Sequence, residues 1–407
     1  MASLKYGKQF VNVELKKETI DLSVKEPDFE IDKDEFYKEL FATLPAGKDR
    51  YRSVAVIISD KTRLCGYPEY LPWVTDVLIQ KGTLAGNITF YVAYGTHPRQ
   101  TEEESLASYG ETYKQFRFVH HDCYDEESIT VLGTTKRGTP ITVRKDVLES
   151  SLIITFGAIS HHYFAAYGGG RKLLFPGLAK REAVYYNHGL FLDREKRILE
   201  QGCRPGNLEG NPIAEDLKEI DDKLPSKISI HGILNSKGEV RKLLFGTNYS
   251  DFSSACKLHD RYFRSAIKEQ FDLVIASGGG YPKDINFIQA HKAMHNASAF
   301  VRDGGKLIIL AECIDGIGSK YFMQYLEAGG FDNAFSILEK NYEGNGGTAL
   351  SMMTKTNRIG IYMLTSLKEQ SCKTLNVTKL KESDILTMIN AERGSVAVIQ
   401  NASMLVR

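Results

Sequence analysis

The side chains best suited to chemistry gather in one short stretch, residues 160–177, and in one histidine that follows it. The stretch holds two adjacent histidines, three consecutive glycines and the cationic pair Arg171-Lys172, and His188 lies a short way downstream. Glycine lacks a Cβ and reaches positive φ at little cost, so such a loop can approach a ligand closely. Imidazole rings beside an amine and a flexible backbone predict a reactive or ligand-binding loop.

The Gly168 to Lys172 segment resembles a phosphate cradle, because glycine N–H groups before a helix N-terminus favour an anion. It is not a Walker A sequence, since Leu173 follows the lysine where that motif needs Ser or Thr. A tight turn with a solvated Arg-Lys pair explains the segment equally well. A second glycine cluster, Gly278-Gly279-Gly280, indicates only a strand-to-helix turn.

Three apolar runs that read as buried strands each end in polar residues. Because ligands collect outside the carboxyl ends of parallel strands, we expect these groups to share one edge of a sheet. The strands are residues 53–59, 88–94 and 151–159, and the polar groups that follow them are Asp60 and Arg63, His97, and His161 and His162.

Each of these groups has an ordinary explanation when taken singly. Asp60 could be an N-cap, Arg63 part of a surface ion pair, and His188 a surface histidine. Adjacent residues of a strand face opposite sides, so only one of His161 and His162 is expected to enter a site. Five such groups on neighbouring strand ends favour an active site over a set of coincidences.

The alternation of strands and helices restarts after residue 270, with apolar runs at 272–277 and 306–310. At 407 residues the chain exceeds what one core usually supports. The sequence therefore predicts two α/β domains, each with a mainly parallel or mixed sheet flanked by helices, and an active site in the cleft between them. The expected domains are residues 1–255, catalytic and cofactor-binding, and 256–391, substrate-binding, with 392–407 as a candidate to rejoin the first.

Composition excludes several classes of protein. The net charge is +1 without a long block of one sign, which gives no support for binding nucleic acid or an anionic membrane. Six scattered cysteines, without a CxxC motif, fit neither a thiolate zinc site nor a disulfide framework and favour the cytoplasm. The polar start and the lack of a long apolar run predict no signal peptide and no membrane span. A small-molecule partner is the better expectation.

These residues as a set resemble the nickel-pincer-dependent lactate racemase family. The likeness rests on order and spacing over most of the chain: Asp60-x-Thr62-Arg63, Gly95-Thr96-His97, His162 ten residues before Lys172, His188 sixteen residues after it, and Gln289-x-x-Lys292.

The resemblance implies an isomerase that inverts the 2-carbon of a 2-hydroxy acid by reversible hydride transfer. The implied cofactor is nickel held in pyridinium-3,5-bisthiocarboxylic acid mononucleotide, attached to Lys172 and supplied by cofactor-assembly proteins. His188 would be the metal ligand, and His97 and His162 the acid–base pair. The other implied contacts are Asp60, Lys61, Thr62 and Arg63 for the nucleotide, and Arg63, Gln289 and Lys292 for the substrate.

The sequence also departs from the family pattern. Arg171 stands where a small residue is usual, and it could either add a phosphate contact or crowd the tether. Gly168 replaces a common serine, and Ile288 replaces a tyrosine. The sole tryptophan is Trp73, so the one expected near residues 343–347 is missing. A more open pocket near Asn345 would suit a 2-hydroxy acid that is larger or more polar than lactate.

Two rival functions remain open from the sequence. One is a pyridoxal phosphate enzyme with Lys172 as the Schiff base, although no carboxylate partner for the pyridine nitrogen can be identified. The other is a non-catalytic nucleotide-binding relative, against which the presence of His97, His162, Lys172 and His188 counts.

Overall fold

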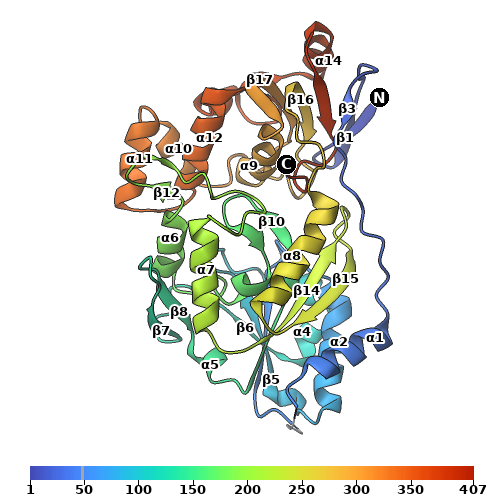
Figure 1. Cartoon of the computed structure of the whole chain (residues 1–407), viewed down its shortest axis with the longest axis vertical. Helices are drawn as coiled ribbons and strands as arrows, with labels where there is room; N and C mark the ends of the chain where they lie inside the picture. The colour runs from blue at the N-terminus through green and yellow to red at the C-terminus, as the bar shows by residue number, and fades with distance from the viewer. Residues whose placement is uncertain (47–49) are drawn as a thin grey trace. The chain divides into compact units, whose positions relative to one another are not determined.

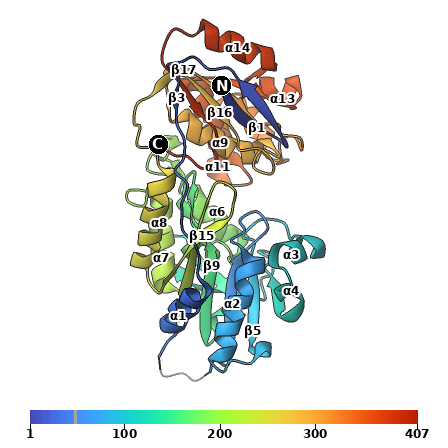
Figure 2. The same ribbon diagram turned by 90° about the vertical axis from the view of Figure 1, so that its right-hand side faces the viewer.

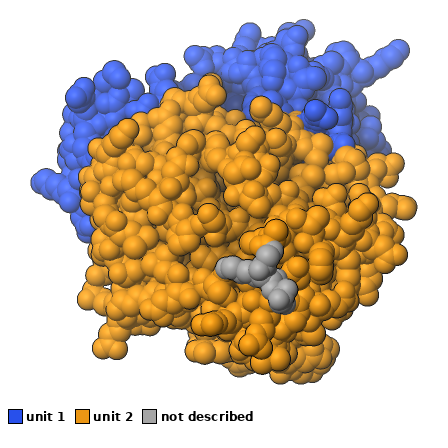
Figure 3. Space-filling view, turned by 60° about the horizontal axis from the view of Figure 1, so that its bottom comes forward, with its two compact units in different colours: residues 1–25, 191–201, 261–407 blue, residues 26–190, 202–260 orange. Residues whose placement is uncertain are grey.

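The computed structural model describes residues 1–46 and 50–407, which form two compact α/β units (Figure 3). Unit 2 comprises residues 26–190 and 202–260, and unit 1 comprises residues 1–25, 191–201 and 261–407. Each unit is built on a six-stranded sheet with helices, so the predicted fold class is confirmed. The division after residue 260 lies close to the expected one, but residues 1–25 and 191–201 fall in unit 1.

The sheet of unit 2 is mixed, with strand order β15-β14-β9-β4-β5-β6 (Figure 1). All its neighbouring strands run parallel except the β14–β15 hairpin, which is antiparallel. The three expected buried strands are neighbours at the centre, since β4 pairs with both β9 and β5. Their bounds are β4 Val54–Ser59, β5 Ile88–Ala93, β6 Arg117–His120, β9 Leu152–Ala158, β14 Ile228–Leu234 and β15 Val240–Gly246.

Alternate residues of these strands form the main core of unit 2. Val54, Val56 and Ile58 of β4 pack against α1 and α2, because every second side chain points to the same face (Figure 2). The helices of this unit are α1 Lys33–Thr43, α2 Tyr67–Gln80, α3 Glu102–Tyr109, α4 Thr112–Gln115, α5 Lys145–Leu148, α6 Arg181–Gly189, α7 Pro212–Lys223 and α8 Tyr249–Phe263, which runs past residue 260.

Short antiparallel hairpins and 3-10 turns complete the framework. The β10–β11 hairpin and the 3-10 turn η2 carry the residues of the reactive stretch. The bounds are β1 Ala2–Tyr6 with β2 Gln9–Val13, β7 Ile129–Thr134 with β8 Pro140–Arg144, β10 Ser160–His162 with β11 Ala166–Gly168, β12 Leu192–Asp193 with β13 Ile198–Leu199, η1 Ala85–Asn87 and η2 Gly170–Leu173.

The sheet of unit 1 is parallel throughout, with order β19-β18-β17-β16-β20-β3. The strand that comes last in the sequence, β20, pairs with β16 and β3. The C-terminal segment therefore packs in this sheet and does not rejoin the sheet of β4 and β9. The strand bounds are β3 Ile20–Asp21, β16 Phe271–Ser277, β17 Val301–Leu310, β18 Gly360–Leu364, β19 Thr378–Leu380 and β20 Val396–Ile399.

Two apolar layers cover this sheet. Helices α9 and α12 pack on one face, while the β1–β2 hairpin and α14 pack on the other. The helices are α9 Phe287–Ser298, α10 Phe322–Leu326, α11 Phe331–Lys340, α12 Gly346–Arg358, α13 Glu369–Thr374 and α14 Glu382–Ala391. In the described ranges no helix has the length and apolar character needed to cross a membrane.

Unit 1 buries a basic cluster between α9 and α12. The ammonium of Lys355 donates to the carbonyl of Ser351 at 2.9 Å and to Nε2 of His291 at 3.3 Å. Burial, with a smaller contribution from the charge of Arg358, lowers the pKa of Lys355 to about 7. Burial and Lys355 likewise hold the pKa values of His291 and His295 well below the usual range. The cluster therefore costs free energy whenever it takes up protons.

We expect Lys355→Met to raise the free energy of unfolding at pH 7 by about 2–4 kcal/mol. In the wild type the unfolded chain binds the Lys355 proton below a pKa of ~10.4, whereas the folded chain does so only below about 7. Stability therefore rises with pH between these values, by at most about 1.4 kcal/mol per pH unit. Urea unfolding from pH 7 to 10 should show this slope in the wild type and its loss in the variant.

The exposed Lys373→Met serves as the matched control and should keep the wild-type slope. An unchanged slope in Lys355→Met would show that Lys355 has an ordinary pKa in the folded protein.

Candidate functional site

The side chain of Asp60 organises the loop after β4 through hydrogen bonds. Its Oδ1 accepts hydrogen bonds from the backbone N–H of Thr62 at 2.8 Å and from the Thr62 hydroxyl at 2.5 Å. Its Oδ2 lies 2.7 Å from Nδ1 of His97, which follows β5 on the neighbouring strand. Asp60 is only 4% exposed, so its carboxylate is buried beside the more exposed His97. Asp60 thus orients a histidine.

The charge of Asp60 is secured by its partners. Burial alone would raise its pKa, but the hydrogen bond and charge of His97, together with Thr62 and Arg63, hold the pKa of Asp60 at about 2. An ionised carboxylate can only accept, so Nδ1 of His97 carries the ring proton of the neutral imidazole and Nε2 keeps a lone pair. The His97 side chain is 42% exposed, which leaves Nε2 accessible as a base.

We expect Asp60→Asn to lower kcat by about 10²–10⁴-fold. Both Thr62 donors point at Oδ1, so the amide oxygen must take that place and the NH₂ must face His97. The amide then donates to Nδ1, which places the ring proton on Nε2 and removes the base. ¹⁵N shifts of the His97 ring report the tautomer, and Glu104→Gln, on the exposed Lys61 ion pair, is the control. Unchanged shifts and turnover would contradict this role.

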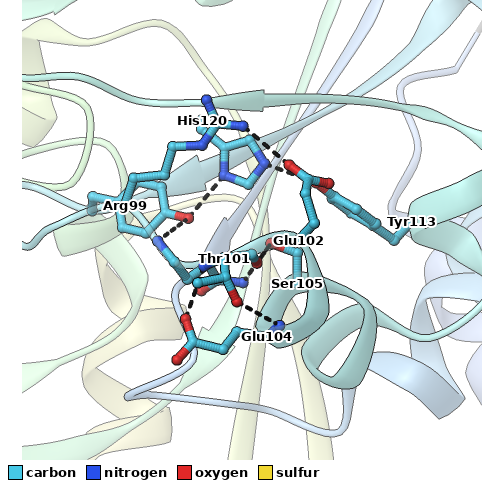
Figure 4. Close-up of polar contacts among 9 residues, drawn as sticks. Arg99, Thr101, Glu102, Glu104, Ser105, Tyr113 and His120 are labelled. Atoms are coloured by element: carbon cyan, nitrogen blue, oxygen red, sulfur yellow. Dashed lines mark hydrogen bonds and ion pairs between the residues drawn. The ribbon is translucent and has the colours of Figure 1, made fainter.

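Polar contacts anchor the loop that carries His97 to α3 and β6 (Figure 4). The Tyr94 hydroxyl lies 2.8 Å from Nδ1 of His120, and the Tyr113 hydroxyl lies 3.2 Å from Nε2 of the same ring. Thr101 and Glu104 form a capping box at the start of α3. Further contacts come from Arg99 to Glu102 and from Gln100 to Ser105. The loop is therefore held on both sides of His97.

His188, in the last turn of α6, lies among cations. Desolvation is the largest of the effects that lower its pKa to about 3, and the charges of Lys172, Arg63 and His97 add to it. The carbonyl of Val184, one helical turn earlier, hydrogen-bonds the ring. The side chain is partly exposed. A neutral imidazole with one nitrogen bound to a carbonyl has its other nitrogen available for a metal.

The ring of Phe164 connects the second histidine to this group. Its centroid lies 4.6 Å from that of His162 and 5.0 Å from that of His188, edge-on in both cases. The backbone N–H of Ala165 donates to Nδ1 of His162 at 3.2 Å. The neighbouring His161 lies 2.7 Å from Asp260 instead. His162 and His188 thus contact the same Phe164 ring, whereas Nε2 of His161 lies against Asp260.

The glycines of the reactive stretch allow the chain to pack against itself. Gly169 has φ +75°, and a Cβ there would lie 2.2 Å from the carbonyl oxygen of Ala158. Gly170 has φ +53°, and its Cβ would lie 2.5 Å from the Phe252 ring. These contacts explain both glycines without an anion. The cradle interpretation therefore has no support from this geometry.

The side chain of Arg171 packs against two aromatic residues of α8. Its guanidinium is 3% exposed and lies over the rings of Phe252 at 4.9 Å and Tyr249 at 5.5 Å, both on α8. Nη1 donates to the Tyr249 hydroxyl at 3.1 Å. Lys172 instead acts on His188. Arg171 is thus a buried anchor of η2, and this direction supports neither a phosphate contact nor a crowded tether.

Three further expected site residues, Lys61, Gln289 and Lys292, have partners close to them in the structure. The ammonium of Lys61 pairs with Glu104 of α3. Gln289 and Lys292 are one helical turn apart on α9 of unit 1, where Nζ of Lys292 lies 2.7 Å from Oε1 of Gln289. Among the residues described here, no group of three or more His, Cys, Asp or Glu side chains is placed to hold a metal ion.

Sequence reasoning missed two contributors to this arrangement. Phe164 could have been found, since it is two residues from His162 within the same stretch. Asp260 had no local signal, because it is 99 positions from its partner His161.

Two family models match the chain. The lactate racemase N-terminal domain matches residues 6–199, and the lactate racemase C-terminal domain matches residues 267–346.

Two curated relatives are both named lactate racemase. The protein from Thermoanaerobacterium thermosaccharolyticum is 30% identical over 277 residues, which are 68% of this chain and 63% of the relative. The protein from Lactiplantibacillus plantarum is 30% identical over 297 residues, which are 69% of this chain and 67% of the relative. The chain thus aligns with a little under two thirds of the first relative's length.

Solved structures extend the likeness in fold. The lactate racemase apoprotein from T. thermosaccharolyticum superposes with a TM-score of 0.87 and 26% identity, covering 100% of this chain and 99% of that one. A protein from Thermotoga maritima superposes with a TM-score of 0.69 and 16% identity, covering 94% and 99% of the two chains, and shows the shared fold alone.

Proposed function

The chain belongs to the lactate racemase family, and we propose that it is an isomerase that inverts the 2-carbon of a 2-hydroxy acid. The observation that carries this proposal is the cluster at the carboxyl ends of β4 and β5. There Asp60 orients His97, and the charges of Lys172 and Arg63 act on His188. A racemase needs a base, a charge for the substrate carboxylate and a place for a hydride acceptor, and this cluster contains candidates for each.

The residues present fit a nickel-pincer nucleotide. Lys172 offers an amine for the covalent bond, and His188 offers a neutral ring nitrogen, a ligand type that suits nickel. Thr62 and Arg63, in the loop after β4, are proposed contacts of the nucleotide, which assembly proteins would supply. When bound, the cofactor would provide an electron-poor ring carbon that takes the hydride from C2 of the substrate and returns it to either face.

The two histidines would move the protons. Nε2 of His97 accepts the proton of the 2-hydroxyl as the C2–H bond breaks, and a planar 2-keto acid forms. After the keto acid turns, His162 donates a proton to the oxygen as hydride returns to the opposite face. His97 thus accepts one proton and His162 donates one. At the start of each inversion one of the two rings must therefore be protonated and the other neutral. The reverse reaction exchanges the two roles.

Cations suit the substrate carboxylate. We propose that Arg63 binds it, and that Gln289 and Lys292 of α9 bind the carboxylate or the hydroxyl. With Ile288 before Gln289 and no tryptophan near Asn345, a substrate larger or more polar than lactate is expected. The six cysteines are scattered singly along the chain, which fits a reducing compartment such as the cytoplasm.

The test is the composition and activity of protein purified from cells able to make the cofactor. We expect about one nickel per chain, a Lys172 peptide with added cofactor mass, and stereochemical change in one member of a panel of chiral 2-hydroxy acids that includes lactate and sugar acids. Protein without nickel and with an unmodified Lys172 peptide would overturn the proposal. Lys180→Arg, at a half-buried lysine that precedes α6 and pairs with Glu126, serves as the control for the mass assignment.

A further inference from the structure

Helix α8 holds the reactive stretch at both of its ends. Near its start, Tyr249 and Phe252 receive the guanidinium of Arg171, one residue before Lys172. Near its end, Asp260 contacts the β10–β11 hairpin, one residue before His162. The backbone that carries the expected tether and the expected base is therefore fixed by one helix, which lies about 80–100 positions later in the chain.

Asp260 contacts one residue on each strand of the β10–β11 hairpin. Its Oδ1 lies 2.7 Å from Nε2 of His161 and accepts a hydrogen bond from the Tyr167 hydroxyl at 2.8 Å. His161 and Tyr167 are directly paired on the two strands, in the rung next to the pair His162 and Ala166. One carboxylate oxygen thus ties both strands of a three-rung hairpin to α8.

The fixed orientation of His161 also determines the orientation of His162, the next residue of the strand. Because successive side chains face opposite sides, fixing His161 toward α8 directs His162 to the other side. There His162 contacts Phe164 and accepts from the N–H of Ala165. Ala166, the first residue of β11 and the partner of His162, has φ +65°, a conformation that a non-glycine residue holds only when its surroundings impose it.

We propose that Asp260 is a positioning residue for His162, acting through His161 and Tyr167. The proposal rests on the proposed function only in giving His162 a role in proton transfer; the structural part stands without it. Loss of the carboxylate would leave the hairpin paired but free to tilt on α8. A shift of about 1 Å at a reacting group can cost about 10²-fold in rate.

The test compares Asp260→Asn with Lys257→Ala, a substitution of an exposed residue one turn earlier on the same helix. In the cofactor-loaded enzyme we expect Asp260→Asn to lower kcat about 10–100-fold with KM within about twofold, and Lys257→Ala to change neither. In the cofactor-free protein, NMR should show displaced signals for the His162 ring and the Ala165 amide in Asp260→Asn only. Tyr167→Phe, which removes one of the two bonds, should give a smaller shift in the same direction.

A folded Asp260→Asn variant with wild-type His162 and Ala165 signals and wild-type kcat would overturn the proposal. If that variant does not fold, Tyr167→Phe decides the question by the same two readouts, and unchanged signals there overturn it. Displaced signals in a protein that inverts no hydroxy acid would instead contradict the proposed function and leave the positioning role of Asp260 supported.

Discussion

Lys172→Arg should give a folded protein with no covalently attached cofactor and at least about 10³-fold less racemase activity. Arginine keeps the positive charge that acts on His188, so the electrostatics of the site change little. It lacks the amine that forms the bond, and a cofactor that is not tethered would dissociate or lose its orientation. Intact mass, nickel content and turnover measured on one preparation check the three parts of this expectation.

The control for Lys172→Arg is Arg171→Lys, which adds a second amine one residue before Lys172. Because Arg171 points to Tyr249 and Phe252 of α8, a lysine there should remain unmodified and leave the cofactor on Lys172. Cofactor mass on position 171, or full nickel content in Lys172→Arg, would show that attachment does not depend on Lys172.

His97→Gln should lower kcat by about 10²–10⁴-fold in both directions of the reaction while leaving the cofactor content at the wild-type level. Each inversion uses one histidine as base and the other as acid, so the loss of either stops both directions. Glutamine has similar length and can still bond Asp60, but it cannot take up a proton. Turnover from each enantiomer, measured beside nickel content, tests the separation of chemistry from cofactor binding.

The control for His97→Gln is His120→Gln. The His120 ring lies between the hydroxyls of Tyr94 and Tyr113 and anchors the same loop (Figure 4). We expect it to reduce stability more than it reduces kcat. Substantial turnover in His97→Gln from either enantiomer would assign the base to another residue.

Much of the framework could be predicted because it is encoded locally. The run at 54–59 is buried at every position, and a short β-branched run of this kind is typical of a central strand in a parallel sheet. Parallel strands bring their carboxyl ends together, so the proximity of Asp60 and His97 followed from the spacing alone. The hydrophobic pattern identifies the strands, and the right-handed crossover between parallel strands limits how they can be arranged. Both can be inferred from the sequence without knowledge of individual side-chain contacts.

Individual partners could not be predicted in the same way. The hydrogen bond between Asp60 and His97 was not among the expected contacts, and the direction of Arg171 depended on two rings about 80 residues away on α8. A side chain chooses among partners within a few ångströms, and that choice depends on register and rotamer rather than on residue type. The final strand is another case, since its apolar pattern fits either sheet and only pairing with β16 decides between them.

The sequence by itself thus determined the family, the α/β class and the inventory of reactive groups, because motif spacing and periodicity are properties of the chain. Only the tertiary structure decided how the reactive stretch is used. Its glycines serve close packing, Arg171 anchors it to α8, and Asp260 fixes the hairpin that presents His162. These outcomes depend on contacts between segments far apart in the chain, whose geometry is set when the helices pack on the sheet.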